Sequence, residues 1–203
     1  MVKNRSKNEV KRQQILDAAT ALFTEQGYIA TSMMKIASVA DVSKQTVYSH
    51  FGSKEELFSA AITHKCDSAL GLTLASTELA EPRKALLAIG QKFFEMITSK
   101  EALAVHKICA FESRSYPELS ELFYQAAPQR LLTEMTKLME QFDQSGVLSI
   151  PSAKFAAVQF LNVVKGEAFM RIEFNTKKQL PQSEIDAYIE NSVDFFLRGY
   201  QAN

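Results

Sequence analysis

The chain has 203 residues, of which 46% are hydrophobic and only five are prolines, so it is expected to fold as a mostly helical protein with one or two domains. It has no long uncharged apolar run, which excludes a membrane-spanning helix, and its two cysteines cannot form a disulfide framework, so the cytoplasm is the expected compartment. The net charge at pH 7 is zero, but residues 1–65 hold nine basic and six acidic side chains, a net +3, which leaves −3 for the rest of the chain.

This uneven charge bears on the class of partner. Residues 1–12 alone carry five basic side chains against Glu9, and no apolar segment follows them, so they are not a secretory signal. A basic end on an acidic body is typical of a protein whose amino-terminal part binds nucleic acid. A solubilising tail would also explain residues 1–12, if they are taken alone.

An amphipathic helix is predicted ahead of Gly27, a residue that favours the end of a helix. Its apolar positions follow the spacing of a helix that buries one face, and they are Ile15, Ala18, Ala19, Leu22 and Phe23. Lys11 and Arg12 would then lie in its first turns, where the helix dipole disfavours cations. Their presence there suggests that another partner, such as phosphate, uses them.

Residues 31–57 predict three short helices separated by two tight breaks. The first helix can be capped by Ser32, and its apolar side would consist of Met33, Ile36, Ala37 and Ala40. The third begins with a capping box, in which the side chains of Ser53 and Glu56 each accept a hydrogen bond from the other residue's backbone amide.

The second of these helices, Lys44–Phe51, is short and polar. Ser43 can cap its start and Gly52 its end, and it buries only Val47 and Phe51. Its remaining side chains include Lys, Gln, Thr, Tyr, Ser and His but no acid. Because base edges and phosphates accept hydrogen bonds from such side chains, the two helices and their turn predict a helix-turn-helix that enters the major groove of DNA.

The rest of the chain is expected to be helical as well. No Gly-, Pro- or Ser-rich linker lies near Lys65, so a continuous helix reaching to about Ser76 would join a head, residues 1–65, to a body, residues 66–203. Further helices are predicted at Arg83–Ser99, Ala102–Arg114, Pro117–Ser145, Ser152–Phe174 and Ser183–Gly199. Pro128 is expected to break or kink the third of these. The predicted fold class is therefore all-α.

The amino-terminal residues resemble the signature of the TetR family of transcriptional regulators. The resemblance rests on Gly27-Tyr28, Thr31-Ser32, Ile36-Ala37, Ala40, Val42, Ser43, Lys44, Thr46, Tyr48, His50, Phe51 and the run from Ser53 to Leu57. It covers the first third of the chain, while residues 112–148 are weakly similar to the C-terminal domains of the AefR-like subgroup. It implies a DNA-binding head and a helical domain that binds a ligand and dimerises. No cofactor is expected.

The resemblance also implies roles for particular residues. Thr46, Tyr48 and Lys54 match positions that contact phosphates, and Gln45 can pair bidentately with adenine, which is worth ~1–3 kcal/mol of discrimination. The candidate DNA-contacting residues are Thr31, Ser32, Lys35, Ser43, Lys44, Gln45, Thr46, Tyr48, Ser49, His50 and Lys54. Alternatives stay open: Gln45 as a solvated residue, Tyr48 packed in the small core, and a structural role for His50.

Three positions depart from the family's pattern. Lys35 stands where an acid often completes the cap of the first short helix, and Asp41 replaces the usual turn glycine. Gln45 replaces a residue that is usually small. None of these changes removes the motif, but the last two make the operator sequence unpredictable.

Aromatic and methionine side chains are frequent in the body and could line an apolar ligand cavity, although ordinary core packing would explain any one of them. The candidate pocket residues are Phe93, Met96, His106, Cys109, Phe111, Phe123, Met135 and Phe169. His106, Cys109 and Glu112 share a helical face, but a metal site would need further ligands, so no metal is expected.

The last two predicted helices are apolar over a wider face than one core usually needs. The resemblance implies a homodimer held by a four-helix bundle, to which each subunit contributes these two helices; a well-buried pair within one subunit is the alternative. The candidate interface residues are Phe155, Gln159, Val163, Ile189, Val193 and Phe196.

The expected function is a ligand-responsive repressor that binds a double-stranded DNA operator as a homodimer and is released by a small hydrophobic effector. One alternative is a DNA-binding regulator controlled by a protein partner, with no small-molecule pocket. A second is an enzyme housed in a helical bundle. The enzyme lacks support, because the sequence has no HExxH motif, no phosphate-binding loop and no nucleophile with an evident base.

Overall fold

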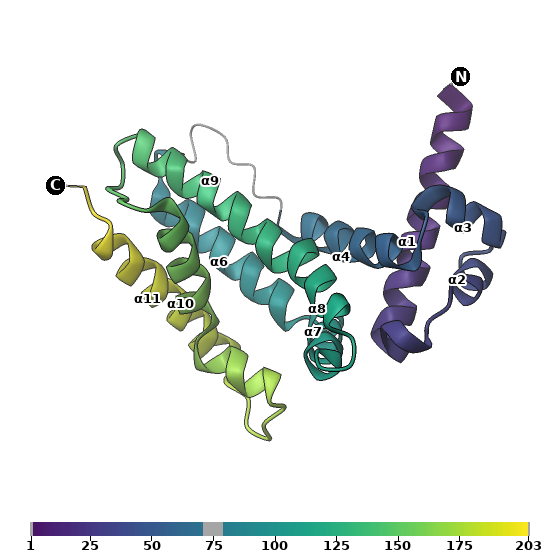
Figure 1. Ribbon diagram of the computed structural model, residues 1–203. Helices are drawn as coiled ribbons and strands as arrows, with labels where there is room; N and C mark the ends of the chain where they lie inside the picture. Colours follow the sequence, from purple (N-terminus) through teal and green to yellow (C-terminus); the bar gives the residue numbers. More distant parts are fainter. Residues whose placement is uncertain (1, 71–78, 203) are drawn as a thin grey trace. The chain divides into compact units, whose positions relative to one another are not determined.

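The structure of the chain, a computed structural model, describes residues 2–70 and 79–202 (Figure 1). These residues form an all-α protein, as predicted. The helices are α1 (Val2–Ala30), α2 (Met33–Val39), α3 (Lys44–Phe51), α4 (Lys54–Leu70), α6 (Pro82–Thr98), α7 (Lys100–Glu112), α8 (Pro117–Tyr124), α9 (Arg130–Gln144), α10 (Ala153–Glu173) and α11 (Gln182–Gly199). The predicted continuation of α4 beyond Leu70 to about Ser76 lies outside the described residues.

The helices divide into two compact units. The first unit holds α1, α2, α3 and α4 up to Ser68, together with α7 and α8. The second unit holds α6, α9, α10 and α11. Each compact unit combines segments that are separated in the sequence, so the units do not correspond to a single division of the chain. The division at residue 65 stays a prediction.

The head of the first unit is a three-helix arrangement around a small core. Ile15 of α1, Ile36 of α2 and Val47 of α3 are fully buried there, and Leu57 and Phe58 of α4 pack against the same core. Helices α1, α2 and α3 therefore each contribute buried residues to one shared core, as the apolar spacing predicts. This core holds α3 with its remaining side chains turned away from it.

The breaks between these helices follow from hydrogen bonds made by short polar side chains. The Ser32 hydroxyl accepts from the Lys35 backbone amide at 3.2 Å, and the Ser43 hydroxyl accepts from that of Thr46 at 3.1 Å. In the predicted capping box, the Glu56 amide donates to the Ser53 hydroxyl and the Ser53 amide donates to the Glu56 carboxylate, both at 3.1 Å. Each helix start thus satisfies amides that have no partner within the helix.

Helices α7 and α8 belong to the same core as the head. Cys109 of α7 and Leu119 of α8 are buried in it, and the Ser120 hydroxyl donates to the Cys109 carbonyl at 2.9 Å. Gly27, where α1 leaves helical geometry with φ 79° and ψ 172°, has Ile108 next to it, 3.6 Å from where a Cβ would stand. This backbone conformation is open essentially to glycine alone, so Gly27 permits the bend, while α7 packs against it at ordinary contact distance.

The second unit is a bundle with a continuous apolar core. Met135, Met139 and Phe142 of α9 are completely buried, and the rings of Phe160 on α10 and Phe196 on α11 meet edge to face at 5.3 Å. Pro128 interrupts the segment ahead of α9 as predicted, because residues Gln125–Gln129 form a π-helical turn between α8 and α9.

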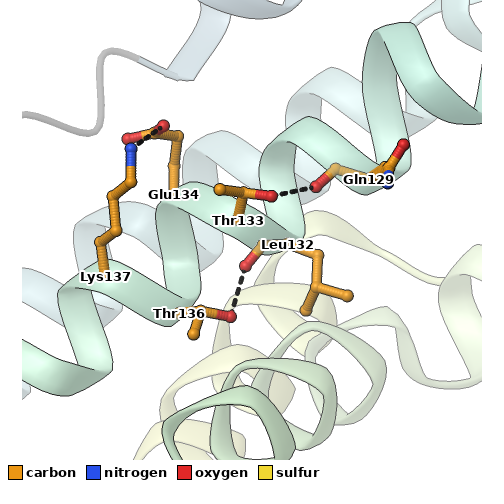
Figure 2. Close-up of polar contacts among 6 residues, drawn as sticks. All are labelled: Gln129, Leu132, Thr133, Glu134, Thr136 and Lys137. Atoms are coloured by element: carbon orange, nitrogen blue, oxygen red, sulfur yellow. Dashed lines mark hydrogen bonds and ion pairs between the residues drawn. The ribbon is translucent and has the colours of Figure 1, made fainter.

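Polar side chains on α9 make hydrogen bonds and ion pairs with groups one turn away. Figure 2 shows the Thr133 hydroxyl donating to the Gln129 carbonyl at 2.9 Å and the Thr136 hydroxyl donating to the Leu132 carbonyl at 2.7 Å. Lys137 pairs with Glu134 at 2.9 Å one turn away. These polar groups are therefore engaged within the helix itself.

Helix α10 contains a second departure from helical geometry, at Gly166. Its φ is 53° and its ψ is −165°, and the Tyr188 ring of α11 packs against it at a distance that leaves no room for a Cβ. The Tyr188 hydroxyl donates to the Val163 carbonyl at 2.9 Å, just before the bend. The bend at Gly166 therefore makes room for the Tyr188 ring, and the hydrogen bond of Tyr188 holds the ring against the bend.

Within the described parts of the chain, none of the helices combines the length and the apolar character that crossing a bilayer would require.

Candidate nucleic-acid interface

Helix α3 exposes a polar, acid-free surface. Val47 and Phe51 are its two buried residues, whereas Lys44, Gln45, Tyr48 and Ser49 are exposed and Thr46 and His50 are half-buried. The predicted division of this helix into a small buried side and a larger polar side is therefore present. A surface rich in donors and free of carboxylates suits a ligand with many acceptor oxygens.

The serine and threonine hydroxyl groups at the start and middle of α3 make local hydrogen bonds. The Ser43 and Thr46 hydroxyls share a hydrogen bond of 2.8 Å, and the Ser49 hydroxyl donates to the Thr46 carbonyl at 2.9 Å. The Lys44 ammonium lies 5.6 Å from the centre of the Tyr48 ring. The Gln45 amide makes no hydrogen bond to another described residue, so its donor and acceptor are both available to a base edge.

Lys54 stands at the start of α4 in a more enclosed setting. Its ammonium lies 4.2 Å from the centre of the Tyr28 ring and 3.4 Å from the Ile29 carbonyl, and partial burial lowers its pKa below the ordinary lysine value. The Tyr28 hydroxyl donates to the Glu55 carboxylate at 2.7 Å. That hydrogen bond lowers the pKa of Glu55, while burial and then Glu55 raise the pKa of Tyr28.

A cation fixed beside the first amides of a helix is a favourable place for an anion. Lys54 has three donor hydrogens, and the Ile29 carbonyl occupies only one of them. On α2, by contrast, the Lys35 ammonium donates to the Gln26 side chain at 2.7 Å, so Lys35 binds back onto α1. The candidate surface thus combines α3 with the start of α4.

Thr31 requires a correction. Only 1% of it is exposed, and its hydroxyl donates to the carbonyls of Gly27 at 2.8 Å and Leu22 at 3.2 Å. It closes the end of α1 and cannot contact DNA. Its neighbour Ser32 is exposed and caps α2.

The eight candidate pocket residues do not form one group. Phe93 and Met135 are buried in the core of the second unit, and Met96 and Phe169 pack against that core. The other four lie in the first unit, where Cys109 is buried, His106 and Phe123 have ring centres 6.1 Å apart, and Phe111 is 85% exposed. Phe111 is therefore wrong as a pocket residue. A groove of about 370 Å³ in the second unit is lined instead by Pro82, Val147, Leu148, Asp194, Leu197, Arg198 and Gln201.

Cys109 is a free, buried cysteine. Burial raises the pKa of its thiol to about 12, so it stays protonated at neutral pH and is a poor nucleophile or metal ligand. Among the described residues no group of three His, Cys, Asp or Glu side chains is arranged to hold a metal ion.

The candidate dimer residues also separate into two kinds. Phe155 is 65% exposed on α10, Gln159 is exposed and accepts a hydrogen bond from the Tyr200 hydroxyl, and Val163 is half-buried. Ile189, Val193 and Phe196 are instead buried in the core of their own subunit, so they cannot supply an interface.

The exposed apolar face of α11 is formed by residues other than Ile189, Val193 and Phe196. Tyr188 and Phe195 are 42% and 62% exposed, and they stand seven residues apart on one side of the helix. Sequence reasoning missed them, although their two-turn spacing, offset from that of Ile189 and Phe196, was a usable signal. It also missed the Arg12 guanidinium, which lies 5.3 Å from the centre of the Phe51 ring.

Comparisons with known proteins cover nearly the whole chain. A sequence profile described as bacterial regulatory proteins, tetR family, matches residues 15–61. A second profile, described as the C-terminal domain of AefR-like transcriptional repressors, matches residues 84–202. The first match contains α2, α3 and the start of α4, and the second contains α7 to α11.

Individual relatives agree with the profiles. The solved structure of the flavonoid-responsive regulator FrrA is 33% identical, with a TM-score of 0.74 over 94% of this chain and 97% of that one. The transcriptional regulator YvkB of Bacillus subtilis is 27% identical over 194 residues, which are 94% of this chain and 97% of YvkB. The transcriptional activator FasR of Mycolicibacterium smegmatis is 37% identical over 95 residues, and this match spans 46% of the chain but only 43% of FasR.

Proposed function

The chain belongs to the TetR family of DNA-binding transcriptional regulators, which are not enzymes, and on this premise we propose that it is a repressor that a small hydrophobic effector releases from its operator. The observation that carries the proposal is the exposed, acid-free surface of α3, with Lys44 and the exposed amide of Gln45 at its start. Its proposed place of action is the cytoplasm, where the chromosome lies.

In the proposed complex, a homodimer places two copies of α3 in successive major grooves, about 34–36 Å apart. Gln45 reads a base and Lys44 faces the groove. Tyr48 and Lys54 bind phosphates, Lys54 together with the first amides of α4. Ser32, Ser43, Thr46, Ser49 and His50 hold or flank this surface. Thr31 takes no part, because it is buried.

The proposal is tested by selecting DNA from a random pool with the purified protein. We expect enrichment of a two-fold symmetric sequence whose half-sites lie about one helical turn apart. Binding should be tighter to this sequence than to a scrambled duplex by at least about 1,000-fold. Recovery of random DNA with no enriched sequence would overturn the proposal.

The proposed effector is supported by one relative and by one family profile. FrrA is described as responsive to flavonoids. The AefR-like profile matches residues 84–202, which contain most of the second unit. A compound that binds the body and lowers operator affinity would support release by an effector, since the coupling between the two sites is reciprocal. A screen of flavonoids and other hydrophobic compounds against the protein–operator complex measures this directly.

Control by a protein partner is the second candidate. It is favoured by the burial of Phe93 and Met135 in the core of the second unit, and by their absence from the lining of the groove beside Pro82 and Leu197. This alternative would be favoured if no compound lowered the operator affinity but a cell extract did, and if the activity of that extract were destroyed by protease.

The proposed dimer gives a mutational prediction. Exchanging Phe155 and Phe195 for glutamate should weaken dimerisation by at least about 100-fold, because it places four charges per dimer on an apolar face that we expect to be dry. Analytical ultracentrifugation should then find a folded monomer at micromolar concentration. The matched control is Phe111→Glu, at an 85% exposed position in the first unit, which should remain a dimer. A double variant that still dimerises would place the interface on another surface.

A further inference from the structure

Helix α1 begins well before the core that it serves. Its first buried residue is Ile15, whereas residues 8–14 are all exposed except Arg12, which is half-buried. The helix itself is described from Val2, so about 13 residues, or ~20 Å of helix, precede the core. This amino-terminal extension, residues 2–14, continues past α3 (Figure 1).

The charge of this extension is unusual for the start of a helix. It contains Lys3, Arg5, Lys7, Lys11 and Arg12 against a single acid, Glu9, and its first turn holds no acid. The helix dipole disfavours cations at this end. The three lysines also follow each other at four-residue intervals, a spacing at which like charges repel. A polyanion alongside would remove both penalties.

The extension leaves the head beside the surface described above. The Arg12 guanidinium lies over the ring of Phe51, the last residue of α3, at 5.3 Å. The part of the extension that precedes Arg12 therefore starts from the carboxyl end of the helix that we expect to face DNA.

We propose that the amino-terminal extension binds the phosphate backbone that flanks each half-site, and so lengthens the DNA segment that the protein covers. The inference rests on the proposed function of α3. A helix with its side chains is about 10–12 Å wide and the minor groove is about 6 Å wide, so the extension contacts phosphates and does not enter the minor groove. Its contribution is to affinity and to salt dependence, with little effect on the sequence that is chosen.

The test compares two triple variants of equal charge on the selected operator. Lys3→Gln, Lys7→Gln and Lys11→Gln remove three charges from the extension, and Lys92→Gln, Lys177→Gln and Lys178→Gln remove three exposed charges from the second unit. The slope of log affinity against log salt should fall by about 0.9 for each phosphate that the variant no longer neutralises. We expect the extension variant to lose about 10- to 100-fold in affinity at about 0.15 M salt and the control variant to lose less than about 2-fold.

Hydroxyl-radical footprinting separates the possible outcomes. The extension variant should lose protection at the two outer edges of the footprint while the centre stays protected. An unchanged slope and an unchanged footprint on the selected operator would overturn this inference and leave the role of α3 intact. Failure of the wild-type protein to select any operator would instead overturn the proposed function.

A second variant tests whether the helix itself matters. Asn8→Pro keeps every charge but breaks the helix in the middle of the extension, seven residues before the first buried side chain, so the head should fold normally. It should lose the outer protection as the triple variant does. Full outer protection with Asn8→Pro would show that the charges act as a loose tether and would overturn the helical contact.

Discussion

Replacing Lys44 and Gln45 together with alanine should lower the affinity of the protein for its operator by about 100-fold or more, with no loss of stability. Both side chains are exposed at the start of α3, and alanine is the residue that best favours a helix. A bidentate base contact is worth ~1–3 kcal/mol, and the dimer makes each contact twice, so about 2–6 kcal/mol is removed.

The two residues should differ when they are changed singly. Gln45→Ala should lower affinity for the operator more than affinity for a scrambled duplex, because it removes a contact to a base. Lys44→Ala should lower both alike and reduce the salt dependence. Fluorescence anisotropy with labelled operator and scrambled duplexes measures both quantities.

The matched control removes the same two side-chain types from the second unit. Lys92→Ala with Gln144→Ala, both exposed, should bind the operator as the wild type does. If the α3 variant keeps the wild-type ratio of operator to scrambled affinity, α3 is not the element that reads the sequence.

Gly166→Ala should lower the free energy of unfolding by about 3 kcal/mol or more. The backbone at Gly166 lies in a region open essentially to glycine, which costs any other residue about 1–3 kcal/mol. A Cβ there would also lie 2.3 Å from a carbon of the Tyr188 ring. The ring is held in place by the bond from its hydroxyl to the Val163 carbonyl, so it cannot simply move aside.

Urea denaturation checks this prediction against two controls. Gly199→Ala, where a Cβ would meet nothing within 4 Å, should change stability by at most about 1 kcal/mol, and in the favourable direction. Adding Tyr188→Ala to Gly166→Ala should relieve the steric part of the loss and leave the backbone part. If Gly166→Ala is as stable as the wild type, α10 is not bent at this residue in solution.

The head was predictable because its determinants are local. Ser32, Ser43 and the pair of Ser53 with Glu56 lie within four residues of the amides that they cap, and Asp41 adopts the left-handed backbone, with φ 51°, that its place in the turn suggests. The small apolar set around Val47 also follows from helical spacing. The prediction that Thr31 contacts DNA was wrong, because Thr31 is buried against the end of α1, where its hydroxyl donates to the Leu22 and Gly27 carbonyls.

The body was less predictable because its apolar residues serve two purposes. Helix α11 has two apolar stripes, one with Ile189, Val193 and Phe196 and another with Tyr188 and Phe195. Spacing separates the stripes but does not say which one meets the chain's own core, because that depends on how α6, α9 and α10 assemble. The bend at Gly166 was equally hidden, since a glycine inside a helix does not reveal its φ.

The shared burial of Cys109 and Leu119 with the head has a consequence for engineered hybrids of such regulators. A hybrid that joins residues 1–65 to the remainder of a different repressor would separate the core of the head from Cys109 and Leu119, which are buried in it. The mismatch between the two parts would lower expression or change the response to the effector, even where the operator contacts are correct. Transplanting residues 100–128 along with the amino-terminal segment keeps the interlocking parts together.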